Sequence, residues 1–180
     1  MRVLICLAAA LVVAAPATAQ DQLIPDLIAP RTAKKLSPLP GGEWAYVLPR
    51  HARVVGRDAR SKTMSIALPW YGNWCEVRLV TLVAPKGTPG TLAMVARARL
   101  SKLSAVRQQP AVRVGQGSLR VLGTYTPLNN PTLRRFFGEW YRVENGVGLV
   151  VHTDGPIALQ AACTGMTEAL VLGMKRVSAP

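Results

Sequence analysis

The sequence contains few of the side chains on which most enzymes and metal proteins depend. Of its 180 residues, 2 are His, 3 are Cys and 9 are Asp or Glu. No pair among His51, His152, Cys75 and Cys163 shows the close spacing of a zinc module. We therefore expect no metal ion and no cofactor.

Catalytic and phosphate-binding motifs are missing as well. The sequence has no Gly-x-Ser-x-Gly nucleophile elbow. The pairs Gly115-x-Gly117 and Gly146-x-Gly148 stand in predicted turns and do not open a helix, as a dinucleotide or Walker loop must. These absences favour a protein that is not an enzyme.

The first nineteen residues have the three parts of an export signal. Arg2 supplies a positive start, residues 3–15 form an apolar run, and Ala17-Thr18-Ala19 supplies small residues for cleavage. Pro16 ends the run short of the roughly twenty apolar residues that a membrane span needs. We therefore predict a signal peptide over residues 1–19, a periplasmic or secreted location, and no transmembrane segment after cleavage.

The remaining chain is strongly basic. The full sequence carries 22 Lys and Arg residues and a net charge of +13, which becomes +12 when Arg2 is removed with the signal peptide. Outside the inner membrane, such charge fits anionic envelope components, such as lipid head groups and acidic polysaccharide, or acidic partner proteins. Export argues against nucleic acid. In the alternative interpretation, the charge serves solubility alone.

The expected domain organisation is simple. Residues 20–42 carry four prolines and end in Gly41-Gly42, which predicts a proline-rich arm or linker. Residues 43–178 are long enough for one globular domain. With Cys6 removed in the signal peptide, Cys75 and Cys163 are the two remaining cysteines, and in an oxidising compartment we expect them to form a disulfide.

The periodicity of apolar residues predicts a mixed set of elements. Strands are predicted at residues 44–48, 53–57, 63–68, 75–83 and 157–163, with a hairpin over 112–125. Residues 91–107 gather apolar side chains on one side of a helix. Residues 164–175 fit a helix or a strand, and the helix is preferred. The result is an α+β fold, with an antiparallel sheet of about six strands and two helices packed on one face. The alternative is a mostly-β sandwich or barrel. This element order is similar to that of the PsbP-like group, although no residue motif carries the similarity.

The clearest local signal is a two-residue turn at Asn145-Gly146, which predicts a type I′ hairpin over residues 136–153. The turn fixes the register of the two strands. On one face it places Trp140 opposite Val151, and on the other it places Glu139 opposite His152.

That register provides the weak catalytic candidates. His152 could act as a base, with Glu139 or Asp154 orienting it, in a small secreted hydrolase. No serine stands in a recognisable nucleophile position, and an ion pair across the hairpin explains the same geometry without chemistry.

Two segments could form a binding surface. The loop from Pro69 to Trp74 carries Trp70, Tyr71 and Trp74, which would stack on a ligand if exposed or plug the end of the sheet if buried. We favour the buried arrangement. The second segment carries a basic cluster of Arg50, Arg53, Arg57, Arg60 and Lys62. Its composition favours a solvated sheet edge, with an anion-binding patch as the alternative. Arg134 and Arg135 form a smaller basic pair with the same alternatives.

These observations lead to one main functional expectation. We expect an exported, non-enzymatic binding or accessory protein of the bacterial cell envelope, which engages an anionic component or an acidic partner protein through its basic surface. A hydrolase centred on His152 and a structural accessory subunit docked by its aromatic loop are the alternatives.

Overall fold

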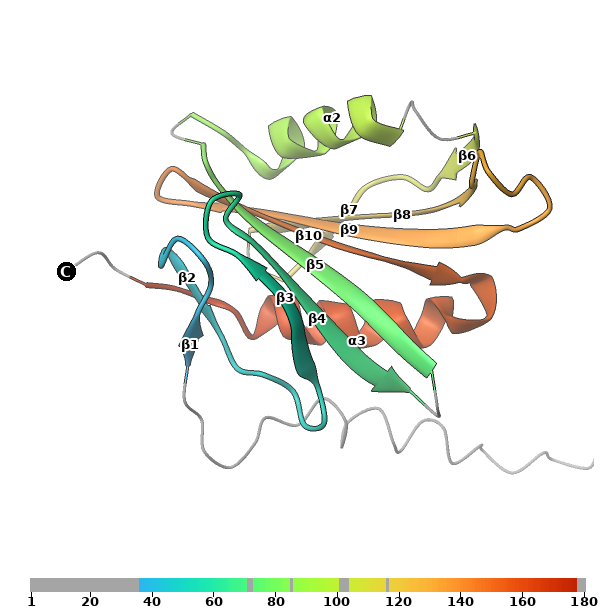
Figure 1. The fold of residues 1–180 in the computed structure, drawn as a ribbon. Helices are drawn as coiled ribbons and strands as arrows, with labels where there is room; N and C mark the ends of the chain where they lie inside the picture. Colours follow the sequence, from blue (N-terminus) through green and yellow to red (C-terminus); the bar gives the residue numbers. More distant parts are fainter. Residues whose placement is uncertain (1–35, 71–72, 85, 101–103, 116, 178–180) are drawn as a thin grey trace, which may run out of the picture.

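The computed structural model describes residues 36–70, 73–84, 86–100, 104–115 and 117–177. The predicted signal peptide, most of the proline-rich arm and Tyr71 lie outside the described residues. Within the described chain, an antiparallel sheet of eight strands forms the centre of the molecule, and a sheet of three short strands lies beside it (Figure 1).

The strands of the large sheet follow a spatial order that differs from their order in the chain. From one edge they are β3 (Arg53–Asp58), β4 (Thr63–Trp70), β5 (Asn73–Val83), β10 (Val147–Pro156), β9 (Arg135–Glu144), β8 (Ser118–Thr126) and β6 (Ser104–Gln108), with β7 (Val112–Val114) also paired to β8. The small sheet contains β1 (Ser37–Pro38), β2 (Trp44–Tyr46) and β11 (Lys175–Arg176). The antiparallel sheet and the two described helices agree with the predicted α+β class, but the expectation of about six strands is too low for the large sheet. Because most of the described elements are strands, the mostly-β alternative also fits in part.

The two α-helices of the described chain pack on opposite faces of the large sheet, and the prediction that both cover one face is wrong. Helix α2 (Pro89–Leu100) lies on one side and α3 (Gln160–Leu172) on the other (Figure 1). Successive side chains of a strand point to opposite faces. In β9, Phe136 packs in the core beneath α3, whereas Phe137 packs in the core beneath α2. Both faces are therefore apolar and both need a cover.

The ends of the helices differ from the predictions. Residues 157–163, predicted as a strand, form the short 3-10 turn η1 (Ile157–Leu159) and the start of α3. The C-terminal helix exists but begins at Gln160 and ends at Leu172, because Lys175–Arg176 pairs with β2 instead. Likewise α2 ends at Leu100, and Ser104–Gln108 leaves the helical pattern to pair with β8. In both places a distant strand offers backbone partners that the local sequence does not reveal.

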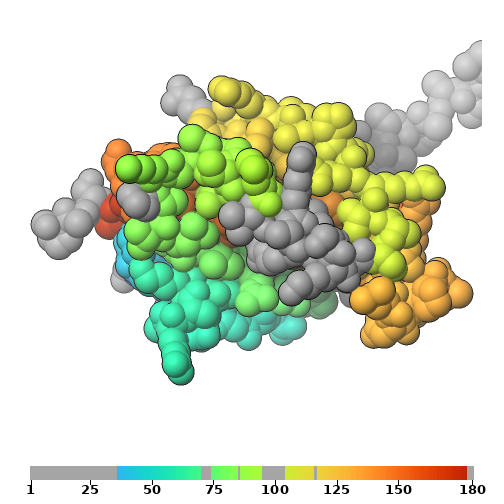
Figure 2. Space-filling view, turned by 90° about the horizontal axis from the view of Figure 1, so that it is seen from above, coloured from blue at the N-terminus to red at the C-terminus, as the bar shows by residue number. Residues whose placement is uncertain are grey.

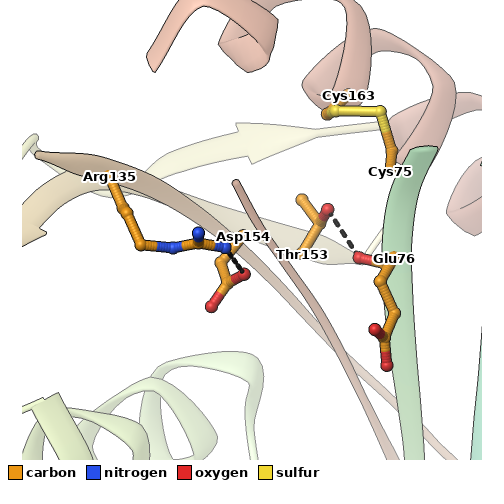
Figure 3. Close-up of a disulfide and its surroundings, with 6 residues drawn as sticks. All are labelled: Cys75, Glu76, Arg135, Thr153, Asp154 and Cys163. Atoms are coloured by element: carbon orange, nitrogen blue, oxygen red, sulfur yellow. Dashed lines mark hydrogen bonds and ion pairs between the residues drawn. A yellow bond between two sulfur atoms is a disulfide. The ribbon is translucent and has the colours of Figure 1, made fainter. Parts of the chain in front are cut away.

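The predicted disulfide is confirmed. Cys75 of β5 and Cys163 of α3 are bonded across the interface between the sheet and the helix (Figure 3). Both cysteines are buried in the core on the α3 side. The bridge closes a loop between residues separated by 88 positions in the sequence.

The predicted β9–β10 hairpin is confirmed in its register. Glu144 pairs with Val147, and Glu139 pairs with His152. Asn145 and Gly146 both have positive φ angles, 48° and 74°, as a type I′ turn requires. The hairpin lies in the middle of the sheet because β10 also pairs with β5.

None of the helices in the described part of the chain is both long enough and apolar enough to cross a membrane.

Candidate functional site

A network of polar side chains lies on the α2 side of the sheet, at the end of the β9–β10 hairpin that is distant from its turn. Its centre is the pair formed by Glu139 and His152, whose Oε1 and Nδ1 atoms are 3.2 Å apart. The hydroxyl of Tyr141 donates a hydrogen bond to the other carboxylate oxygen of Glu139. Glu139 is buried, whereas His152 is about one-third exposed at 34%. A buried carboxylate is thus satisfied from two sides.

Asp154 continues the network along β10. Its carboxylate accepts hydrogen bonds from the Arg135 guanidinium at 2.7 Å and from the Tyr125 hydroxyl at 2.9 Å. Arg135 also donates from its Nε atom to the Tyr125 hydroxyl at 3.2 Å. Figure 3 shows the ion pair between Arg135 and Asp154. The Nε2 atom of His152 lies 3.8 Å from Asp154, which links the two halves of the network.

The electrostatics of the network keep His152 charged. Burial alone would lower the pKa of His152, but its hydrogen bonds to Asp154 and Glu139 and the charges of these carboxylates outweigh burial and raise the pKa to about 9. Burial would raise the pKa of Asp154, but its bonds to His152, Arg135 and Tyr125 hold that pKa well below its usual range. At neutral pH the imidazole is therefore a cation between two carboxylates.

This geometry does not provide the base that the hydrolase hypothesis needs. A general base must be neutral to accept a proton, and His152 is held in its protonated form. Ser65 is the serine on the same face that is aligned with His152, but Arg78 stands between them in the register. Two strand spacings separate Ser65 from His152, about 10 Å. The interpretation of Glu139 and His152 as an ion pair across the hairpin therefore fits the structure better.

Two shallow hollows adjoin the network. One, of about 250 Å³, is lined by Glu76, Arg78, His152 and Asp154. The other, of about 260 Å³, lies over β3, β4 and β5 and shares Glu76 and Arg78. These two side chains belong to β5, and sequence reasoning did not single them out. Among the described residues, the hollow at His152 is lined by charged side chains alone, whereas the hydroxyl side chains Ser61, Thr63 and Ser65 line the other hollow.

The predicted basic cluster lies along an edge of the sheet. Strand β3 is the outermost strand on its side, and all six of its residues are exposed. Arg50, Arg53, Arg57 and Arg60 are exposed. Lys62 is half-buried and forms an ion pair with Glu43 at 2.7 Å. Figure 2 looks onto the α2 side and shows the blue-green residues of β3 and of the following turn along the rim of the molecule. We call β3 with Arg50 and Arg60 the basic edge.

The aromatic loop contributes one described side chain to the same region. Trp74 is 46% exposed, whereas the loop was predicted to be buried. The guanidinium of Arg53 lies 4.3 Å from the centre of its ring, a cation–π contact. Trp70 ends β4, but its side chain and Tyr71 lie outside the described residues. Trp74 and the basic edge therefore form a continuous surface.

The smaller basic pair is divided between two environments. Arg134 is exposed. Arg135 is half-buried and belongs to the network through Asp154. The hairpin register contained a signal for this contact, because counting from the turn places Arg135 opposite Pro156 and diagonal to Asp154. Tyr125 could not be found in this way, since its place beside Arg135 depends on the pairing of β8 with β9.

Comparison with known proteins provides fold relatives alone. No protein family and no curated protein matches the sequence. Among solved structures, LpqN of Mycobacterium tuberculosis, described as involved in cell envelope biogenesis, superimposes with a TM-score of 0.58 at 11% identity, over 80% of this chain and 91% of LpqN. The PsbP protein of the cyanobacterium Synechocystis gives a TM-score of 0.51 at 8% identity, over 79% and 92% of the two chains. The chain shares their fold.

A protein of Bacteroides thetaiotaomicron has a similar structure over part of its length, with a TM-score of 0.52 at 11% identity. The match covers 80% of this chain but 48% of that protein. The similarity of element order to the PsbP-like group, which the sequence suggested, is thus also a similarity in three dimensions.

Proposed function

We propose that the mature chain is a periplasmic or secreted accessory protein of the cell envelope, which binds an anionic envelope component or an acidic partner protein without transforming it. The observation that carries the proposal is the basic edge, where four exposed arginines gather on and beside an exposed outer strand. The predicted signal peptide and the involvement of the fold relative LpqN in cell envelope biogenesis support the location.

The charge of the basic edge is poorly neutralised by its own neighbours. Asp58 is the one acidic residue between Arg50 and Lys62. Its carboxylate accepts hydrogen bonds from the backbone N–H of Arg60 and from the Ser61 hydroxyl. These bonds lower the pKa of Asp58 and keep it charged. Since Lys62 is paired with Glu43, several positive charges face a single negative one, and an acidic ligand is attracted.

The polar network agrees with a binding role. The network holds His152 as a cation and leaves no neutral imidazole for proton transfer. It fixes strands β8, β9 and β10 together through charged pairs on their α2 side. We therefore assign the network to the support of the sheet and the basic edge to recognition.

The proposal is tested by the binding of the mature protein, residues 20–180 with its disulfide intact, to envelope fractions from the cells that produce it. Binding should be strong at about 0.1 M salt and weak at about 1 M salt, where the Debye length falls to about 3 Å. Binding that salt does not change would contradict the proposal.

A pair of charge-reversal variants locates the surface. Arg50→Glu with Arg60→Glu changes the basic edge, and neither guanidinium has a hydrogen bond among the described residues. Lys86→Glu with Arg113→Glu is the matched control, because both side chains are exposed elsewhere on the molecule and the net charge changes equally. We expect the first variant to lose binding and the second to retain it. Equal loss in both variants would mean that net charge, and not the basic edge, governs binding.

The exposed Trp74 supports a contribution from its ring to the same contact. Trp74→Ala should weaken binding without changing its salt dependence, because it removes apolar contact area and no charge.

A further inference from the structure

We propose that the partner bound by the basic edge contributes an extended acidic segment, which pairs with β3 as an additional strand of the large sheet. This inference rests on the proposed function and specifies the conformation and chemistry of the partner. Addition of a strand to an exposed sheet edge is a general mode of peptide recognition, in which main-chain hydrogen bonds give affinity and alternate side chains give selectivity.

Strand β3 has an open edge. It pairs with β4 on one side and is the last strand in the order of the sheet. Among the described residues, no hydrogen bond between backbone groups joins β3 to an element other than β4. All six of its residues are exposed. A row of backbone N–H and C=O groups along such an edge can pair with another chain.

The side chains of β3 suit a partner strand with acidic side chains on both of its faces. Arg53 lies on the α2 side of the sheet, above Trp74, and Arg57 lies on the other side, where it contacts Met64. Positive charge is therefore available on both faces of an added strand. Val54 and Val55 are 40% and 49% exposed. Acidic side chains opposite the arginines and apolar ones opposite the valines would make favourable pairs across the strands.

The same features disfavour pairing between two copies of this protein. Two β3 strands side by side would bring their arginines together, and like charges on adjacent strands repel each other. The register of β3 also shifts between Val54 and Gly56, which marks a bulge. Charged residues and bulges commonly protect sheet edges from self-association. An acidic strand meets no such repulsion, so charge selects the occupant of the edge.

The test uses a synthetic peptide of about eight residues, a length that matches an ordinary strand. Its Glu residues stand at odd spacings, so that they point to both faces of an extended strand, and Val and Thr fill the other positions. Backbone hydrogen exchange in the mature protein is followed residue by residue by NMR, with and without the peptide. We expect the β3 amides that point away from β4 to exchange at least about tenfold more slowly with the peptide, because they gain hydrogen-bond partners.

Two control peptides separate strand pairing from charge. In the first, two central Val or Thr residues are replaced by Pro, which keeps every Glu but removes backbone donors, and we expect at least about tenfold weaker binding. In the second, Lys replaces Glu, and binding should be lost.

These experiments distinguish a failure of strand addition from a failure of the proposed function. If the acidic peptides bind in a salt-dependent way but β3 exchange does not change, or the Pro peptide binds equally, strand addition is wrong while charge-driven binding stands. If no acidic peptide binds, although Arg50→Glu with Arg60→Glu still abolishes envelope binding, the extended acidic partner is wrong. Protection of β3 that grows with protein concentration without peptide would assign the edge to a second copy and overturn the proposal.

Discussion

Breaking the bond between Cys75 and Cys163 should cause a large loss of stability. The bridge closes a loop between residues 88 positions apart, and in the chain-entropy model such a loop stabilises the folded state by about 4.5 kcal/mol. A domain of this size has a free energy of unfolding of about 5–15 kcal/mol in total. Reduction should therefore remove between about a third and nine-tenths of the free energy of unfolding at 25 °C.

The measurement is urea unfolding followed by the fluorescence of the tryptophans, for the oxidised and the reduced protein. With an m-value of about 2 kcal/mol per molar urea, the midpoint should fall by about 2 M. The variant Cys75→Ala with Cys163→Ala serves as a control for packing. Because both sulfurs are buried, the variant should lose about 1 kcal/mol more per cysteine than the reduced wild type, which keeps its sulfur atoms.

The reasoning is refuted if the reduced protein stays within about 1 kcal/mol of the oxidised protein. That result would mean that the unfolded chain is already constrained near the two cysteines, so that cross-linking removes little of its freedom. A large loss in the alanine variant without a comparable loss in the reduced protein would assign the effect to packing.

Three further predictions concern the polar network and the sheet. The pKa of folded His152 is raised to about 9, so its contribution to stability is fully present below an unfolded pKa of about 6.5 and is lost as pH rises through 9. His152→Gln should flatten the dependence of stability on pH over this range. A flat dependence in the wild-type protein would refute the assignment. Gly123→Ala should lower the free energy of unfolding, measured by heat or urea, by about 2–3 kcal/mol, because its Cβ would lie 2.5 Å from the ring of Phe137. The control Gly165→Ala in α3 should be neutral or stabilising, because its Cβ would have nothing within 4 Å. Gly146→Ala should cost about 1–2 kcal/mol through its positive φ, and an unchanged stability would mean that the turn changes type.

The basic edge depends partly on the local sequence and partly on the pairing of distant strands. Strand β3 could be predicted from its sequence, and so could the solvated character of its arginines. Its charged composition also favoured a sheet edge, but the strands that complete the sheet beyond β4 could not be predicted, because they are set by pairings between distant parts of the chain. The folded sheet brings the arginines of β3 together with Trp74 on one surface, and the binding proposal rests on that surface.

The polar network also depends partly on the local sequence and partly on the pairing of distant strands. The two-residue turn fixes Glu139 opposite His152, and both the pair and its register could be predicted from the hairpin alone. Tyr125 enters through β8, and the hollow beside the network is lined by Glu76 and Arg78 of β5. These residues are brought in by strand pairings between distant parts of the chain, so spacing along the sequence could not reveal them.

The sequence by itself determined the features that depend on short-range geometry or on the small number of cysteines. These are the Asn145-Gly146 hairpin and its register, the pairing of Cys75 with Cys163 and most of the strands. Tertiary structure decided where the helices end, that they cover opposite faces, and which strands lie next to one another beyond β4. The physical reason is that a turn constrains only its neighbours, whereas the cover of a sheet face and the order of the strands depend on contacts between residues far apart in the chain.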